Sequence, residues 1–185
     1  MSVRNSKITL LGVAAAFVLP VLIAKLALDN GWFTQGATNK GELLQPTRDL
    51  SAVFADEEPK WRLVYSVPAN CDQACENAII SIHQVWMALG RETDRAQATV
   101  LVSENSDAGV LDKLGKEQNL HLVKVSERAL NLAIPADDSA TILLVDTLNN
   151  AMLRYPVSGD RQTAIQRSRD ILADVKKLLK LSRIG

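Results

Sequence analysis

Hydrophobic and polar positions divide the chain into an apolar N-terminal run and a longer region in which short strand and helix patterns alternate. The run from Ile8 to Ala24 has no charged residue, and residues 25–28 extend it far enough to cross a hydrocarbon core of about 30 Å as a helix. Lys25 lies inside this extension, where its long side chain can reach the lipid headgroups. The pattern therefore predicts one transmembrane helix.

Two interpretations of the apolar run remain open, an uncleaved anchor and a cleaved secretory signal. Arg4 and Lys7 precede the run, as in either kind of segment. Cleavage requires small residues after the run, whereas this run continues through Leu28 with no such site, so we favour the anchor. The basic residues favour a cytoplasmic N-terminus. In a bacterium this predicts a single-pass inner-membrane protein whose domain faces the oxidising periplasm.

Composition after the anchor predicts a tether and one folded domain. We assign residues 1–29 to the cytoplasmic N-terminus and transmembrane anchor. Residues 30–60 contain several glycines and prolines, so we expect a tether and entry segment with at most a short strand or hairpin around 42–50. Residues 61–185 are enough for one domain with its own hydrophobic core.

The region after residue 60 alternates between strand and helix patterns. A β-branched and aromatic run at 61–67 ends at Pro68, and the helical stripe Ile79, Ile82, Trp86 and Leu89 then ends at Gly90. We expect further strands at 98–103, 121–125, 140–145 and 151–157, and helices at 107–118 and 160–181. This order predicts an α/β fold of the thioredoxin-like type, a mixed sheet flanked by helices.

Charge and motif content exclude several classes of function. The chain has 21 basic and 21 acidic residues, whereas nucleic-acid-binding proteins usually carry a basic excess on one face, so we expect no nucleic-acid partner. We find no phosphate-binding loop, Ser-His-Asp set or zinc-ligand spacing in the sequence. Hydrolase and nucleotide-binding functions therefore have no support.

The cysteines Cys71 and Cys75 are the candidate functional residues. They lie between the first expected strand and helix, at the sheet edge where α/β folds place their chemistry. If the helix starts in this loop, the pair is about 5–6 Å apart, within reach of a disulfide or a shared metal ion. The free N–H groups of a helix start lower a thiol pKa, and the charges of Asp72 and Glu76 oppose this. An inert structural disulfide is the alternative, although closing so small a loop adds little stability.

Neither histidine is expected to complete a metal site. His83 follows Cys75 by eight residues, about 12 Å along a helix, which is too far to share a metal ion with both sulfurs. His121 begins a short strand, and if that strand is parallel to the first it lies at the wrong end of the sheet. Met87 and Met152 are interpreted as core residues.

These features resemble the Sco/SenC family, membrane-anchored thioredoxin-like proteins that help deliver copper to cytochrome c oxidase. The resemblance covers the anchor, the strand and cysteine loop at 63–75 with its three-residue gap, and residues 135–150. Prolines flank the family's cysteines, where this chain has Asn70 or Asp72 and Glu76. The family's third copper ligand is a histidine, and Asp138 occupies its position here.

The resemblance implies copper binding that is weak or transient, through Cys71 and Cys75 with Asp138 at the third position. A carboxylate is a poor ligand for Cu(I), so a histidine introduced at 138 should strengthen binding. By their own pattern, Asp137 and Asp138 are typical of a turn or strand start on a solvated surface.

The resemblance also implies an assembly factor for a respiratory haem–copper oxidase, with an oxidase subunit or another copper protein as partner. The dithiol would act as a thiol–disulfide reductant or as a copper carrier, and the missing histidine favours the reductant, with Cys71 attacking. One alternative is a non-catalytic membrane-tethered scaffold that docks oxidase subunits. The other is a general periplasmic thiol–disulfide oxidoreductase, although such enzymes usually have two residues between their cysteines. Whether the protein is an enzyme stays open.

Overall fold

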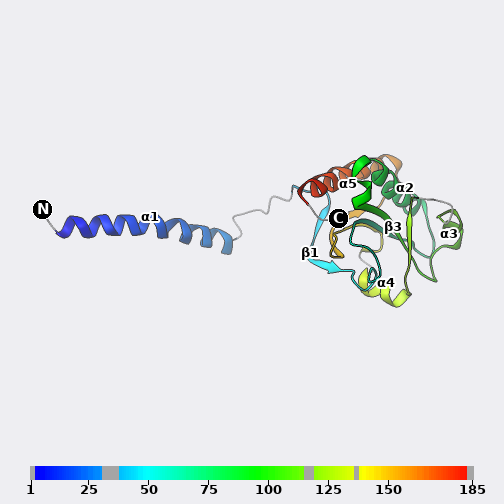
Figure 1. The fold of residues 1–185 in the computed structure, drawn as a ribbon, viewed down its shortest axis with the longest axis horizontal. Helices are drawn as coiled ribbons and strands as arrows, with labels where there is room; N and C mark the ends of the chain where they lie inside the picture. The colour runs from blue at the N-terminus through cyan, green and yellow to red at the C-terminus, as the bar shows by residue number, and fades with distance from the viewer. Residues whose placement is uncertain (1–2, 31–37, 115–118, 136–137, 183–185) are drawn as a thin grey trace. The chain divides into compact units, whose positions relative to one another are not determined.

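The computed structural model describes residues 3–30, 38–114, 119–135 and 138–182. The chain forms two compact units, Met1–Thr38 and Asn39–Gly185. Figure 1 shows the N-terminal unit as a single helix and the other as a sheet with helices around it.

The first unit contains the predicted N-terminal helix, α1 (Val3–Asp29). Its segment Thr9–Asp29 is long and apolar enough to cross a membrane, judged by length and composition. Large apolar side chains such as Leu10, Phe17 and Val21 are exposed along it. A helix that is apolar all round is suited to a lipid environment, so α1 is a candidate membrane span.

The second unit is built on a six-stranded mixed sheet with the order β1-β6-β5-β2-β3-β4. Its strands are β1 (Glu42–Asp49), β2 (Trp61–Ser66), β3 (Ala96–Val102), β4 (His121–Lys124), β5 (Thr141–Val145) and β6 (Asn150–Pro156). Strands β2, β3 and β4 are parallel, while β5 runs antiparallel to β2, β6 to β5, and β1 to β6. The carboxyl ends of β2 and β3 and the beginning of β5 therefore lie at the same end of the sheet, which we call its carboxyl edge.

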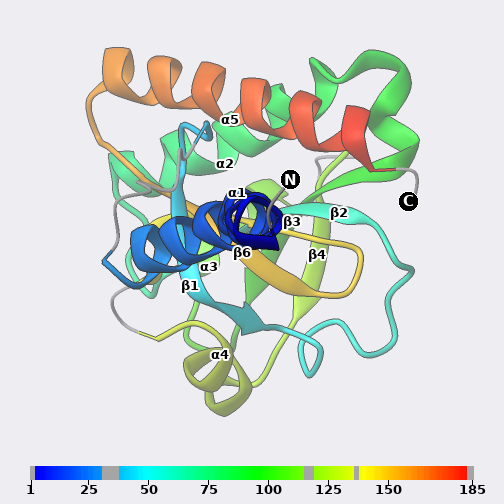
Figure 2. The same ribbon diagram turned by 90° about the vertical axis from the view of Figure 1, so that its left-hand side faces the viewer.

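Helices cover both faces of this sheet, as the sequence predicts. The long helices α2 (Gln73–Met87) and α5 (Arg161–Leu181) lie side by side on one face, and α4 (Glu127–Ala133) lies on the other (Figure 2). The 3-10 helix η1 (Gly90–Arg95) precedes β3, and α3 (Ala108–Leu114) follows it. The predicted thioredoxin-like layer order is confirmed.

Two hydrophobic clusters hold the layers together, one on each face. In β2, Leu63 and Tyr65 belong to the cluster beneath α2 and α5, whereas Val64 belongs to the cluster on the α4 side. The same alternation runs through β3 and β5. Strands that are buried on both faces have continuous apolar sequences, and this is why the sequence pattern predicted them.

The folded unit begins at Asn39, whereas the strong strand and helix patterns of the sequence begin at residue 61. Strand β1, only weakly indicated by sequence, pairs with β6 at the sheet edge, so residues 39–60 fold with the domain. Lys40 and Gly41 donate their backbone N–H groups to the Asp174 carboxylate of α5, at 2.8 and 2.9 Å. A buried carboxylate far along the chain thus fixes the start of the domain.

Other differences concern the helices. Helix α4 was not predicted, because seven residues with a Ser126 N-cap are too few to show a helical period. The expected helix at 107–118 is observed as Ala108–Leu114, and residues 115–118 lie outside the described part of the chain. Within α5, Ile165 is 39% exposed, because six residues of helix rotate it away from the buried face of Ile171.

Candidate redox site

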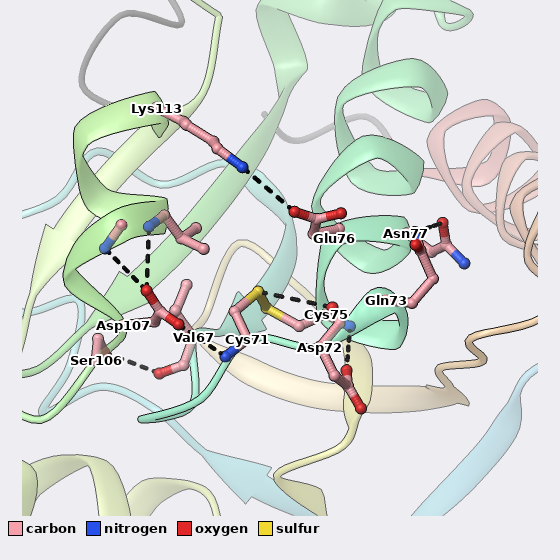
Figure 3. Close-up of a disulfide and its surroundings, with 12 residues drawn as sticks. Val67, Cys71, Asp72, Gln73, Cys75, Glu76, Asn77, Ser106, Asp107 and Lys113 are labelled. Atoms are coloured by element: carbon pink, nitrogen blue, oxygen red, sulfur yellow. Dashed lines mark hydrogen bonds and ion pairs between the residues drawn. A yellow bond between two sulfur atoms is a disulfide. The ribbon is translucent and has the colours of Figure 1, made fainter.

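The two cysteines form a disulfide between the loop after β2 and the first turn of α2 (Figure 3). Their Cα atoms are 5.2 Å apart. Asp72 is the N-cap of α2, so Cys71 lies just before the helix and Cys75 is its third residue. The bond joins the loop at the carboxyl edge of the sheet to the helix that follows.

The two sulfur-bearing residues differ in accessibility. Cys75 is 1% exposed and belongs to the hydrophobic cluster beneath α2 and α5. Cys71 is half-buried and packs against the edge of the same cluster. An incoming thiol or disulfide can therefore reach Cys71 more readily than Cys75.

The helix start provides both favourable and unfavourable electrostatics for a thiolate. Free backbone N–H groups at this end of α2 favour negative charge. Asp72 already places a carboxylate there, because its Oδ1 accepts the Cys75 N–H at 3.0 Å. Glu76 adds a second carboxylate, and its Oε1 lies 3.4 Å from Lys113 Nζ. The site combines a helix N-terminus with two nearby acids, as the sequence indicated.

The loop between β3 and α3 braces the cysteine loop through three hydrogen bonds. Asp107 Oδ2 accepts the Cys71 N–H at 3.0 Å, and the Asp107 N–H donates to the Pro68 carbonyl at 3.0 Å. The Ser106 hydroxyl donates to the Val67 carbonyl at 2.8 Å. Sequence analysis missed this role, since it placed Asp107 at the start of an expected helix and nothing in the sequence connected it to Cys71. Figure 3 shows the brace beside the disulfide.

The carboxylate of Asp107 is held in its charged form. The N–H groups of Cys71, Val110 and Gly109 lower its pKa, with Cys71 contributing most. These bonds favour the ionised carboxylate, so the stability they provide is present above the ordinary aspartate pKa of about 4 and is lost as pH falls through the lowered value.

Replacing Asp107 by alanine should therefore destabilise the protein in a pH-dependent way. We expect a clear loss of stability at pH 7 that shrinks as pH falls below about 4, because protonation removes the same interaction from the unsubstituted protein. Urea unfolding at several pH values measures it. Asp107→Asn, which keeps one acceptor oxygen, should lose less. A loss that stays constant down to acidic pH would contradict this assignment.

A cleft of about 620 Å³ opens beside the cysteine loop. Tyr65 is one of its lining residues, together with the loop residues Asn70 and Asp72 and residues of helix α4. Burial, with a smaller contribution from the negative charge of Asp72, raises the pKa of Tyr65 to about 12. The phenol stays protonated at physiological pH, so it offers the cleft a neutral hydrogen-bonding group.

The expectation of a solvated turn at Asp138 is wrong, while Asp137 lies outside the described residues. Asp138 is 1% exposed. It lies shortly before β5, and β5 is antiparallel to β2, so Asp138 is at the same carboxyl edge of the sheet as the cysteine loop. Its Oδ1 accepts a hydrogen bond from Arg154 Nη1 at 2.7 Å, and its Oδ2 lies 2.6 Å from Arg48 Nη2. The arginines come from β1 and β6, distant in sequence, so no local pattern could have shown them.

The described residues do not fit a three-ligand copper site. Both carboxylate oxygens of Asp138 are engaged by arginines, so they are not free to coordinate a metal ion. Among the residues that the structure describes, no three His, Cys, Asp or Glu side chains are placed to hold one. The cysteine pair can offer copper two thiolate sulfurs only when the disulfide is reduced.

The two histidines and the two described methionines have other surroundings than the cysteine pair. Strand β4 is parallel to β3, so His121 at its start lies at the opposite edge of the sheet, where its Nε2 is 2.9 Å from Glu57 Oε2. His83 is half-buried in a groove lined by α2 and α3. Met152 packs against the core, whereas Met87, expected in the core, is 50% exposed.

Comparison with known proteins agrees with this geometry. Residues 61–182 match the family described as transmembrane-like, thioredoxin-like, C-terminal domain. The chain belongs to this family. Among curated proteins, none matches its sequence.

Solved structures similar to this one include several Sco proteins. The apo Sco1 protein of Thermus thermophilus is 15% identical with a TM-score of 0.54, covering 76% of this chain and 97% of that one. The copper-bound ScoI of Bradyrhizobium japonicum is 15% identical with a TM-score of 0.41, covering 70% and 98%. A SCO1/SenC family lipoprotein of Bacillus anthracis is 12% identical with a TM-score of 0.46, covering 79% and 98%. The likeness to the Thermus protein shows a Sco/SenC-like thioredoxin fold, as the resemblance predicted.

Proposed function

We propose that this protein is a membrane-anchored assembly factor for a respiratory haem–copper oxidase that reduces a client disulfide with its Cys71/Cys75 dithiol. The observation that carries the proposal is the disulfide between a half-buried Cys71 and a buried Cys75 at the start of a helix. The Sco-like fold supports the pathway, because the Sco/SenC family acts in oxidase assembly. Residues 1–29 would supply the cytoplasmic N-terminus and the anchor, and the thioredoxin-like domain of 61–185, with residues 39–60 folded onto it, would lie in the bacterial periplasm.

The proposed reaction moves two electrons from the protein to the client. The Cys71 thiolate attacks one sulfur of the client disulfide and releases the other as a thiolate, which leaves a mixed disulfide between Cys71 and the client. Cys75 then loses its proton and attacks Cys71 Sγ, which releases the client as a dithiol and the protein as the disulfide seen here. A dithiol oxidoreductase must re-reduce the protein before the next cycle.

Copper transfer is the other version of this proposal, with Cu(I) as cargo held by the two reduced sulfurs. The geometry favours the reductant, because Asp138 is held between two arginines. In the reductant version, Cu(I) titration of the reduced protein gives no tight site. A single tight site in that titration would favour the copper carrier.

The reduction potential of the cysteine pair tests the proposal. We expect a value between about −120 and −270 mV, the range of exchange-active pairs, when the full chain in detergent is equilibrated with glutathione or dithiothreitol buffers. A value well below about −300 mV would indicate a structural bond and favour the scaffold.

Substitution of each cysteine tests the assignment of roles. A disulfide-containing peptide should accumulate as a mixed disulfide on the Cys75→Ser protein, because the buried cysteine is absent and cannot resolve the bond. The Cys71→Ser protein should form no adduct, since its remaining thiol is buried. Mass spectrometry measures both. Equal adduct formation by the two variants would refute the assignment of Cys71 as the attacking residue.

A further inference from the structure

The cleft beside the cysteine loop carries acidic groups on both sides. Asp72 stands on the cysteine-loop side, and Glu127 stands on the α4 side. No lysine, arginine or histidine is among the described residues that line it. Its volume of about 620 Å³ lies within the range of ligand-binding sites.

Any occupant of this cleft lies next to the reactive cysteine. Asn70 and Asp72, the two chain neighbours of Cys71, form part of its wall. Figure 3 shows Asp72 extending from the helix start away from Lys113, which pairs with Glu76 instead. Lys113, the basic residue labelled in this view, therefore pairs outside the cleft and is not among its lining residues.

The two carboxylates of the cleft lack cationic partners. Asp72 Oδ1 accepts the Cys75 N–H at 3.0 Å, and Glu127 Oε1 accepts Asn131 Nδ2 at 3.4 Å. Both donors are neutral, and neither acid has an ion pair within the described parts of the chain. Two carboxylates without a cationic side-chain partner that line one cleft focus negative potential there and attract positive charge.

The remaining lining is suited to a polypeptide. Leu130, Ile134 and Val157 provide apolar contacts, and the amides of Asn70 and Asn131 can both donate to and accept from peptide groups. We propose that this cleft binds the client as an extended segment in which lysine or arginine flanks the reactive disulfide. This inference rests on the proposed function and adds the charge and conformation of the client to it.

Paired synthetic peptides test the inference. Each carries the same intramolecular disulfide, flanked by lysines in one peptide and by glutamates in the other. The reduced full-length protein in detergent should reduce the lysine peptide about tenfold faster at low salt, because opposite charge steers association. The ratio should fall toward one in 0.5 M NaCl, where such attraction is screened. Equal rates at low salt would overturn the inference.

Substitutions that remove the two charges test whether the preference for the lysine peptide arises at this cleft. The Asp72→Asn, Glu127→Gln double variant removes both charges, and asparagine still caps the helix. It should reduce the preference to about twofold or less. The control is Asp56→Asn, Asp94→Asn, which removes two exposed acids that do not line the cleft, and it should keep the full preference. An unchanged preference in the first variant would overturn the assignment to this cleft.

Two further measurements separate failure of this inference from failure of the proposed function. Hydroxyethyl disulfide is neutral, so its reduction reports the dithiol alone; reduction without any peptide preference keeps the function and overturns the inference. Fluorescence anisotropy with a Cys71→Ala, Cys75→Ala protein reports peptide binding without chemistry. About tenfold tighter binding of the lysine peptide supports the cleft even if no disulfide is reduced, and equal affinities overturn it.

Discussion

Replacement of Asp138 by alanine is expected to lower the free energy of unfolding by about 3 kcal/mol, because it removes the anion that holds two cations at the sheet edge. The carboxylate is buried, and it joins Arg48 of β1 to Arg154 of β6. Loss of a partner from a buried pair costs about 3–5 kcal/mol. We expect the lower end, because the arginine side chains are 30% and 34% exposed and can turn toward water.

Urea unfolding of the full chain, followed by tryptophan fluorescence, measures this loss. Asp138→Asn is the matched control, since it keeps the shape and a hydrogen-bond acceptor and should cost less than alanine. Substituting both Arg48 and Arg154 by methionine should destabilise more than either single change, because Asp138 then stays buried without a cation. A loss below about 1 kcal/mol for Asp138→Ala would contradict a structural role.

The same contacts revise what a histidine at position 138 would do. The resemblance implied that Asp138→His would strengthen copper binding, but the structure surrounds this position with two guanidinium groups. An imidazole there loses both ion pairs and faces two positive charges. We expect the substitution to destabilise the domain rather than to create a copper ligand, and Cu(I) titration with parallel unfolding measures both effects.

Replacement of Asp174 by alanine is the second change with a large expected effect, a loss of about 3 kcal/mol. This carboxylate is 2% exposed and accepts hydrogen bonds from three donors, the N–H groups of Lys40 and Gly41 and the Tyr155 hydroxyl, the last at 2.9 Å. Burial, and then the charge of Asp174, raises the pKa of Tyr155, so its hydroxyl remains a donor. Alanine leaves these donors without their acceptor, which costs more than the bonds themselves contribute.

Urea unfolding measures this loss, and hydrogen exchange locates it. Tyr155→Phe is the control, since it removes one of the three bonds and should cost about 1 kcal/mol. Amide exchange in β1 should accelerate in Asp174→Ala, because Lys40 and Gly41 lead directly into that strand. Unchanged protection of β1 would show that Asp174 does not hold the start of the domain.

Close packing at Gly41 offers an independent check on how the start of the domain is held. A Cβ atom added there would lie 2.5 Å from the ring of Tyr155, so the buried ring would have to shift. Gly41→Ala should therefore destabilise the protein although it removes no hydrogen bond, and urea unfolding measures it. A neutral effect would show that the tyrosine has room to move.

Local sequence patterns predicted those parts of the structure that depend on neighbouring residues. The apolar run at 8–24 predicted α1, and continuous apolar runs predicted the strands of the sheet interior, because both are recorded in consecutive positions. The spacing of Cys71 and Cys75 before a helical stripe predicted a pair within bonding distance, since a helix start fixes that geometry locally.

Contacts between distant segments were decided by the tertiary structure. Asp107 acts on Cys71 from the loop of the neighbouring strand, and Asp138 is buried by arginines from the two strands at the far edge of the sheet. The sequence around a charged residue does not show whether that residue will be solvated or buried, because this depends on which side chains the fold brings to it. The sequence by itself determined the interior strands, the long helices and the cysteine pair. The fold decided which of its acids face the cleft, brace the loop or lie between arginines.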